Sequence, residues 1–295
     1  AIRGEVHDGH DFVAAALMAG AALAVVDEAH AARFSADTPL LIVPDVLDAL
    51  RALAVAARAR LNGRVIAVTG SVGKTVVASH LLAPRMNGAQ IFAVESTNET
   101  GADLGLSVDQ LRGEHFGRLF RELLTRDDAI VDVGASNIED FLAHMMRYEG
   151  AHEEISYFVL PVINTGKAQR ETIKTVAALA GLGVAPERVR LLFNRVETSV
   201  EEEFPSLLAY AAKAGEAQAN PKAAIFENEV FELLADLRTT IADVLADQTD
   251  YRALLQQTDR SDHERISHLS NMHALRALAR SVDRQMHAAF AALFA

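Results

Sequence analysis

The stretch that decides the fold runs from Val65 to Thr75 and reads VIAVTGSVGKT. An apolar run suited to a buried strand breaks at Gly70 and Gly73, and a helical pattern resumes after Lys74. A strand, a glycine-rich turn and a helix that opens with Lys-Thr form, in this order, the loop that holds phosphates in nucleotide-binding proteins. The sequence therefore predicts that this loop binds a nucleotide, against the alternative of a chance glycine-rich turn.

Each residue type in the loop has a chemical reason to be there. Glycines let successive backbone N–H groups turn inward around the phosphates, and the start of the helix adds partial positive charge. Lys74 supplies a full positive charge, and the Thr75 hydroxyl can ligand Mg²⁺. Val68 departs from the usual pattern, which has glycine at this position. The residues that we expect to bind the nucleotide are Thr69, Gly70, Ser71, Val72, Gly73, Lys74, Thr75, Val76 and Asn194.

The composition limits the class of protein. With 295 residues, 50% of them apolar, the chain can bury one large core or two ordinary ones. It has no cysteine, which excludes disulfides and thiolate metal sites and favours a reducing cytoplasm. The longest apolar run, Val13 to Val26, is too short to span a bilayer. A formal charge of −12 argues against broad direct contact with nucleic acid, so we expect DNA to be contacted at most indirectly.

Strand candidates alternate with helical patterns along most of the chain. The candidates are Leu23–Val26, Leu40–Val43, Val65–Thr69, Gln90–Val94, Ala129–Val133, Tyr157–Ile163, Val189–Phe193 and Ala223–Phe226. Such alternation predicts an α/β fold with a doubly wound, mostly parallel sheet. Most of these strands are continuous apolar runs, which is typical of a sheet with helices on both faces.

The pattern also predicts how the chain is divided. Residues 1–62 form a small, partial α/β segment, residues 63–230 form the domain with the phosphate loop, and residues 231–295 form a helical extension without strands. Because the chain opens at Ala1 rather than Met and in the middle of a pattern, we expect a preceding piece to be missing or removed. We also expect residues 1–36 to be less stable than the main sheet, since the segment lacks opening strands.

Hydrolysis of a nucleoside triphosphate needs a held Mg²⁺, an oriented water and stabilised charge. Asp132 closes an apolar run and could reach the water shell of Mg²⁺; the alternative is a helix N-cap. Glu95 follows the strand Gln90–Val94 and could orient the attacking water or assist with the metal; the alternative is a surface carboxylate. Lys74, Glu95 and Asp132 are thus the candidate catalytic residues, and Thr75 and Asp132 are the candidate metal ligands.

Asn194 comes directly after the apolar run Val189–Phe193. There, a side-chain amide can hydrogen-bond a purine edge and select adenine, or it can be an ordinary turn residue. Ligands of open parallel sheets gather at the carboxyl ends of the strands, and Thr75, Glu95, Asp132 and Asn194 all lie at or just past such ends. We therefore expect one site for ATP and Mg²⁺ at this edge of the sheet.

The last helical segment carries two stripes. Leu275, Leu278, Val282, Met286, Ala289 and Leu293 trace an apolar face, and Arg276, Arg280 and Arg284 trace a basic one. The basic stripe is either a solvated face or a docking strip for a partner. The eleven histidines do not indicate a metal site: His263, His268 and His273 fall five residues apart, which turns them off a common helix face.

The first seventy-five residues resemble the MurF-type ligases, which add D-alanyl-D-alanine to the peptidoglycan precursor. The residues that carry this resemblance are Arg3-Gly4-Glu5, Asp8-Gly9-His10-Asp11-Phe12, Gly20-Ala21, Val25-Val26, Val43-Pro44-Asp45 and the run Arg64–Thr75. The resemblance covers the later part of that family's small uridine-nucleotide-binding domain. Beyond Thr75 it stops, without counterparts of the ligase's central motifs.

From about Val76 onward the chain resembles the StbB-type plasmid stability ATPases, which are distant relatives of the ParA and MinD partition ATPases. The carrying stretches are Leu81–Gln90, Val94-Glu95-Ser96, Val131–Asn137, Phe193–Glu197 and Ile241–Asp247. This resemblance implies Mg-ATP binding, Asp132 as the magnesium-associated acid, Asn194 near the adenine, and partner proteins of a plasmid maintenance system. The wider group carries a lysine where this chain has Thr69, and that lysine reaches across a nucleotide-sandwich dimer. Its absence argues against ATP-dependent dimerisation of that kind, while a homodimer of another kind stays an open alternative.

The chain therefore reads as a hybrid joined at the phosphate loop. The leading hypothesis is a cytoplasmic ATPase of the plasmid stability type that hydrolyses ATP to regulate its association with partner proteins. One alternative is an ATP-dependent ligase of cell-wall synthesis, which only the N-terminal quarter supports. Another is a nucleotide-binding scaffold that does not hydrolyse, which the departures at Val68 and Thr69 would suit.

Overall fold

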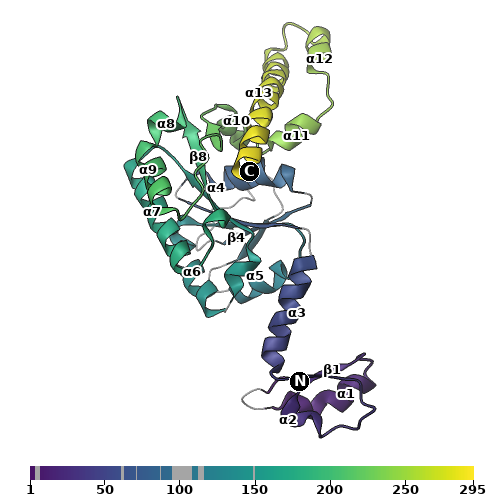
Figure 1. Ribbon diagram of the computed structural model, residues 1–295. Helices are drawn as coiled ribbons and strands as arrows, with labels where there is room; N and C mark the ends of the chain where they lie inside the picture. The colour runs from purple at the N-terminus through teal and green to yellow at the C-terminus, as the bar shows by residue number, and fades with distance from the viewer. Residues whose placement is uncertain are drawn as a thin grey trace. The chain divides into compact units, whose positions relative to one another are not determined.

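The computed structural model describes residues 1–3, 7–60, 63–70, 72–86, 88–94, 108–111, 116–148 and 150–295. The chain divides into two compact units, Ala1–Asn62 and Gly63–Ala295, hereafter unit 1 and unit 2. Figure 1 shows unit 1 in purple to blue and unit 2 from blue through teal and green to yellow.

Unit 1 is a small α/β layer. Its elements are a 3₁₀ helix Gly9–Phe12, α1 Val13–Met18, β1 Ala24–Asp27, α2 Glu28–Ala31, β2 Leu40–Val43 and α3 Val46–Arg60. Strands β1 and β2 pair in parallel, with Ala24 opposite Leu40 and Asp27 opposite Val43. Both strands were predicted, but a two-stranded sheet has a small interior: Val13 and Val26 are the only buried apolar residues among the described side chains of unit 1.

Unit 2 is built on a seven-stranded sheet in its described part. The strands are β3 Val65–Thr69, β4 Gln90–Val94, β5 Val108–Leu111, β6 Ala129–Val133, β7 Tyr157–Val162, β8 Val189–Val196 and β9 Ala224–Phe226. Their order is β5-β4-β6-β3-β7-β8-β9, and every pair is parallel. This confirms the predicted doubly wound α/β sheet. The edge strand β5 was not predicted, because its sequence VDQL lacks a continuous apolar run.

Helices cover both faces of this sheet (Figure 1). One face packs against α5 Phe116–Leu123, α6 Ile138–Arg147, α7 Gly166–Gly181 and α9 Pro205–Ala214. The other packs against the helix after the phosphate loop, α10 Val230–Asp236, α11 Ile241–Ala246 and α13 His263–Leu293. The short helices α8 Val200–Glu203 and α12 Tyr251–Gln257 complete the unit. An apolar core lies on each face of the sheet, and successive residues of β3 point to opposite faces. Val65 and Ala67 belong to one core, and Ile66 and Val68 belong to the other.

The C-terminal region is helical, as predicted, and α13 buries its apolar stripe against the sheet. The basic stripe is divided. Arg280 and Arg284 are exposed, whereas the Arg276 guanidinium lies 4.7 Å from the Tyr251 ring centre and 3.2 Å from a carboxylate oxygen of Asp247. Arg276 therefore ties α13 to the segment before α12 instead of facing solvent.

Among the helices that the structure describes, none combines the length and the apolar character needed to cross a lipid bilayer. The long helix α13 is amphipathic, with buried residues on one side only.

Candidate functional site

The phosphate loop follows the central strand β3, and its backbone requires glycine at two positions. Gly73 has a φ of +84° in the left-handed region and caps α4, Lys74–Val76. A Cβ at Gly70 would lie 2.6 Å from the carbonyl oxygen of Pro161. The Lys74 side chain folds back across the loop and donates from Nζ to the carbonyl oxygen of Gly70 at 3.0 Å. Loop and lysine thus form one compact turn.

The segment after the loop was expected to be helical, and it is, but only its first turn is an α-helix. Val77–Leu82 is a π-helix, and all six of its residues are buried. π-Helical turns are rare and are frequently found at functional sites. Val68, which replaces the usual glycine, is a fully buried strand residue, so the departure is accommodated within β3.

The sheet topology brings Asp132 to the start of the loop helix. Strand β6 lies next to β3, with Asp132 opposite Val68. The Thr75 hydroxyl donates to Oδ2 of Asp132 at 3.3 Å. Asp132 is only 4% exposed, and it is the fourth of five residues in β6 and not a helix cap.

The donors around Asp132 fit a magnesium ion. Oδ1 of Asp132 is buried and has no hydrogen-bond partner among the residues that the structure describes. Burial raises the pKa of Asp132, while the nearby Lys74 and the Thr75 hydrogen bond lower it. Because a cation favours the ionised carboxylate, a metal-bound water at Oδ1 would satisfy the orphaned oxygen and offset the cost of its burial.

Asn194 closes the other side of the loop. It lies inside β8, which runs on to Val196, and a bulge follows it at which Arg195 adopts a φ of +54°. A Cβ on Gly73 would stand 2.0 Å from Nδ2 of Asn194, so the amide rests directly against the loop. Both line a cavity of about 240 Å³ together with Phe231 and Glu227. Leu192 and Phe193 belong to opposite faces of the sheet, so the alternation along β8 turns Asn194 to the face on which the loop helix packs, and the bulge comes only after it.

A second cavity, of about 320 Å³, lies beside the loop. Thr69 and Gly70 line it, together with Glu139 of α6 and Glu171 and Lys174 of α7. The loop therefore has room for a ligand on both sides, with Asn194 in one cavity and the start of the loop in the other.

The structure brings Lys74, Thr75, Asp132 and Asn194 together at one edge of the sheet. Val72 and Val76 are half-buried in the same turn. Ser71 and Glu95 lie outside the described residues, so their expected roles in phosphate binding and in orienting water stay predictions.

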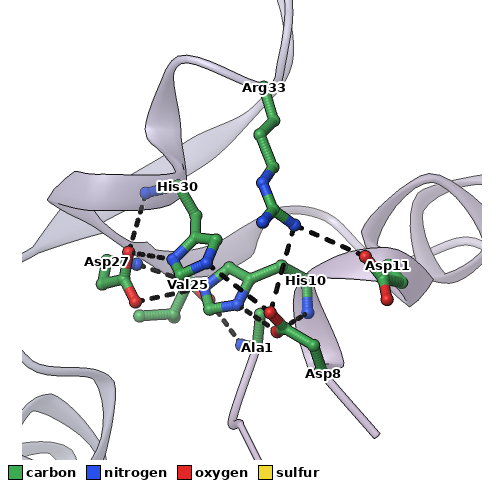
Figure 2. A network of polar contacts seen from close by, with 8 residues as sticks. All are labelled: Ala1, Asp8, His10, Asp11, Val25, Asp27, His30 and Arg33. Atoms are coloured by element: carbon green, nitrogen blue, oxygen red, sulfur yellow. Dashed lines mark hydrogen bonds and ion pairs between the residues drawn. The ribbon is translucent and has the colours of Figure 1, made fainter.

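Two features of the described residues were not anticipated. The first is a network of Asp8, His10, Asp27 and His30 in unit 1, shown in Figure 2. Its sequence signal is an aspartate followed two or three residues later by a histidine, once before the 3₁₀ helix and once before α2. The second is His80, which is 2% exposed within the π-helix. Counting histidine spacing within one helix could not detect either.

Known proteins resemble the chain in two separate ways. No known protein family profile matches it. Over 75 residues it is 43% identical to the UDP-N-acetylmuramoyl-tripeptide–D-alanyl-D-alanine ligase of Synechocystis, covering 25% of this chain and 16% of that protein. Over 95 residues it is 38% identical to the UDP-N-acetylmuramoyl-L-alanyl-D-glutamate–2,6-diaminopimelate ligase of Chlorobaculum tepidum, covering 32% and 18%. The match thus spans less than a fifth of each ligase, and the predicted partial likeness to the MurF-type ligases is confirmed.

Solved structures of ParA- and MinD-type ATPases are also among the similar chains. The McdA–ATP complex of Cyanothece has a TM-score of 0.43 at 11% identity and covers 75% of this chain and 97% of its own. The cell division protein MinD of Aquifex aeolicus has a TM-score of 0.41 at 12% identity, with coverages of 76% and 97%.

Proposed function

We propose that this protein is a Mg-ATP-dependent ATPase of the plasmid stability or partition type, which uses the nucleotide to regulate association with partner proteins. The observation that carries the proposal is the Thr75–Asp132 contact beside Lys74, with one buried oxygen of Asp132 left unpaired among the described residues. A hydroxyl, a carboxylate and a lysine at a helix N-terminus are the set of groups that phosphoryl transfer requires.

Each residue has a defined task in this proposal. The amides of residues 69–76 bind the phosphates, and Lys74 exchanges the Gly70 carbonyl for a phosphate oxygen. Thr75 and Asp132 hold Mg²⁺, which when bound neutralises charge on the phosphates. Glu95 orients the water, and Asn194 hydrogen-bonds the adenine edge from its place against the loop.

The resemblance of residues 76–295 to the plasmid stability ATPases supports partner proteins as the target of regulation. Contact with DNA would pass through these partners, because the net charge of −12 disfavours direct binding. A nucleotide-dependent homodimer remains compatible with this function, but Thr69 stands where the related group has its bridging lysine.

The test combines nucleotide binding by calorimetry with phosphate release, both in the presence of Mg²⁺. Lys74→Ala should lower the rate of phosphate release at least about 100-fold, since it removes charge stabilisation from the reacting phosphoryl group. Asp132→Asn should make the rate of phosphate release depend less on the Mg²⁺ concentration. The matched control is Lys167→Ala on α7, whose side chain is 82% exposed and pairs only with Glu171 among the described residues.

Three outcomes separate the alternatives. Hydrolysis by Lys74→Ala at the parental rate would disprove the catalytic assignment. Tight ATP binding without phosphate release would favour the non-hydrolysing scaffold. Because 75 residues of this chain match a MurF-type ligase at 43% identity, a second candidate is a ligase of cell-wall synthesis. Tight calorimetric binding of UDP-N-acetylmuramoyl-tripeptide would support that candidate, and absence of binding would exclude it.

A further inference from the structure

Unit 1 contains a closed ring of two aspartates and two histidines (Figure 2). Each aspartate accepts a hydrogen bond from the backbone N–H of the histidine that follows it, which caps a helical turn. The same Oδ1 lies 2.6 Å from that histidine's Nδ1, for Asp8 with His10 and for Asp27 with His30. The two imidazole rings stack with centres 4.0 Å apart.

The two distances that join a histidine Nε2 to the other aspartate are too long for good hydrogen bonds. Nε2 of His30 lies 3.5 Å from Oδ2 of Asp8, and Nε2 of His10 lies 3.6 Å from Oδ2 of Asp27. If each Nδ1–H donates to its own aspartate, Nε2 of His10 can accept the backbone N–H of Asp27 at 3.5 Å, whereas Nε2 of His30 turns a lone pair toward Oδ2 of Asp8. If both histidines are protonated, two like charges stack face to face. Neither arrangement satisfies all the polar atoms.

A transition-metal ion resolves this conflict. Two ligands bound to one zinc ion at tetrahedral angles are about 3.4 Å apart, close to the separation of His30 Nε2 and Asp8 Oδ2. Nδ1 of His10, now 2.6 Å from Oδ1 of Asp8, has to move away from that oxygen to bind the same ion. Ligand atoms of Asp8, His10 and His30 all lie within 4.8 Å of one another. We propose that Asp8, Nδ1 of His10 and Nε2 of His30 bind a Zn²⁺-class ion, with Asp27 as the carboxylate that orients both imidazoles.

The proton arrangement of the ring then becomes consistent. With the metal on His10 Nδ1, the proton of this histidine moves to Nε2, which then donates toward Oδ2 of Asp27 and gives up the long hydrogen bond from the Asp27 backbone N–H. His30 keeps its Nδ1–H on Asp27 and offers Nε2 to the metal. A carboxylate behind a ligating histidine is the usual support of such a site. In-plane binding requires the two rings, now 14° from parallel, to tilt apart.

The donor set determines the class of ion. Two imidazoles and one carboxylate suit Zn²⁺, Co²⁺, Ni²⁺ or Fe²⁺, whereas Mg²⁺ and Ca²⁺ prefer oxygen ligands alone. The site would therefore not take the magnesium proposed for the phosphate loop. His10 is buried, but the side chains of Asp8 and His30 are 21% and 16% exposed, which leaves an entry from solvent.

Arg33 competes with an ion at this entry. Its Nη1 lies 4.0 Å from Oδ2 of Asp8 and 3.4 Å from Oδ1 of Asp11. A bound divalent cation would repel this guanidinium, so Arg33→Gln should bind zinc more tightly than the parent chain.

The test uses the full-length chain without nucleotide, because ATP itself chelates metals. Zn²⁺ is titrated against a chromophoric chelator, and Co²⁺ serves as a visible-absorption probe of tetrahedral nitrogen and oxygen ligands. We expect one ion per chain, a loss of affinity of at least about 10-fold in His30→Gln and in Asp27→Asn, and a gain in Arg33→Gln. Asn can still cap α2, so Asp27→Asn tests orientation with the helix intact.

His7→Gln is the matched control, since His7 is exposed in the same unit and contacts only Phe12 among the described rings. Its zinc affinity should equal that of the parent. Equal zinc binding by the parent and His30→Gln, or no binding by the parent at 100 times the protein concentration, would overturn the proposal. ATP binding should be the same in all variants, so failure here and failure of the ATPase proposal are distinguishable.

Discussion

Each of the two units of this chain is stabilised internally by a different kind of interaction. Unit 2 buries aliphatic and aromatic side chains on both faces of a parallel sheet. Unit 1 has two buried apolar residues among its described side chains, and its best-defined contacts join Asp8, His10, Asp27 and His30. Large apolar side chains lie exposed there, namely Ile2, Phe12, Met18, Leu23, Leu41, Ile42, Leu47, Leu50 and Leu53.

Apolar packing thus dominates in one unit, and directional polar contacts dominate in the other. Burial stabilises unit 2 in proportion to area and places the phosphate loop on a rigid strand. In unit 1, geometry is specified by directional contacts that depend on protonation and, by our proposal, on a metal ion. Four experiments can break or sharpen this comparison.

The largest expected effect comes from a matched pair of phenylalanine truncations. Phe158→Ala removes a fully buried ring from β7 and should destabilise unit 2 by about 3–5 kcal/mol. Phe12→Ala removes a ring that is 55% exposed and should cost well under about 1 kcal/mol. The measurement is the free energy of unfolding in urea for each variant. Equal losses would contradict the contrast between the units.

Acid should weaken the two units in different pH ranges. Burial lowers the pKa of His80 to about 4 from 6.5, although Asp243 raises it. The unfolded chain then binds more protons between these values, so unit 2 should lose about 3 kcal/mol as the pH falls from 6.5 to 4. The measurement is the unfolding free energy against pH, with His80→Asn expected to flatten the curve and His268→Asn as the exposed control.

In unit 1 the corresponding group is Asp8. The backbone and side-chain hydrogen bonds of His10 lower the pKa of Asp8 to about 2 from 3.8. The contribution of Asp8 to the stability of unit 1 is therefore complete above pH 3.8 and is lost as the pH falls through about 2. If unit 1 unfolded already at pH 5, before unit 2, the hydrogen bonds between Asp8 and His10 would not be organised as described.

Hydrogen exchange should show the contrast without any mutation. Amides of residues 1–36 should exchange at least about 100-fold faster than those of β3, β6 and β7, because few buried contacts oppose their opening. The measurement is mass-spectrometric exchange of the full-length chain at pH 7. Equally strong protection of residues 1–36 and of the central strands would refute the prediction. An increase in amide protection on adding Zn²⁺ that is confined to unit 1 would sharpen the comparison.

The smallest effect concerns the loop itself. Gly73→Ala places a Cβ at a φ of +84° and 2.0 Å from Nδ2 of Asn194, and should cost about 2 kcal/mol. Asn194→Ala in the same chain removes the close contact and should recover part of this loss. The measurement is the unfolding free energy of both variants. No recovery in the double variant would mean that Asn194 does not rest against the loop.

Much of the fold could be predicted from short stretches of sequence. Val65–Thr69, Gln90–Val94 and Ala129–Val133 are strands at the predicted bounds, because continuous apolar runs between turn residues have few other solutions in a covered sheet. The edge strand Val108–Leu111 was missed, because it pairs on one side only and carries polar residues. The π-helix was also missed, because its residues would equally suit an α-helix.

The sequence by itself determined which residues can do chemistry: a loop whose glycines and lysine suit phosphate, and acids and amides at strand ends. Tertiary structure alone decided which of them meet. Thr75 reaches Asp132 across 57 residues because β6 inserts beside β3, and Asn194 meets Gly73 because β8 presents it on the face of the sheet that the loop helix covers. His10 meets His30 because two capped turns face each other. Local patterns encode backbone conformation, whereas strand order and long-range pairing depend on packing over the whole unit.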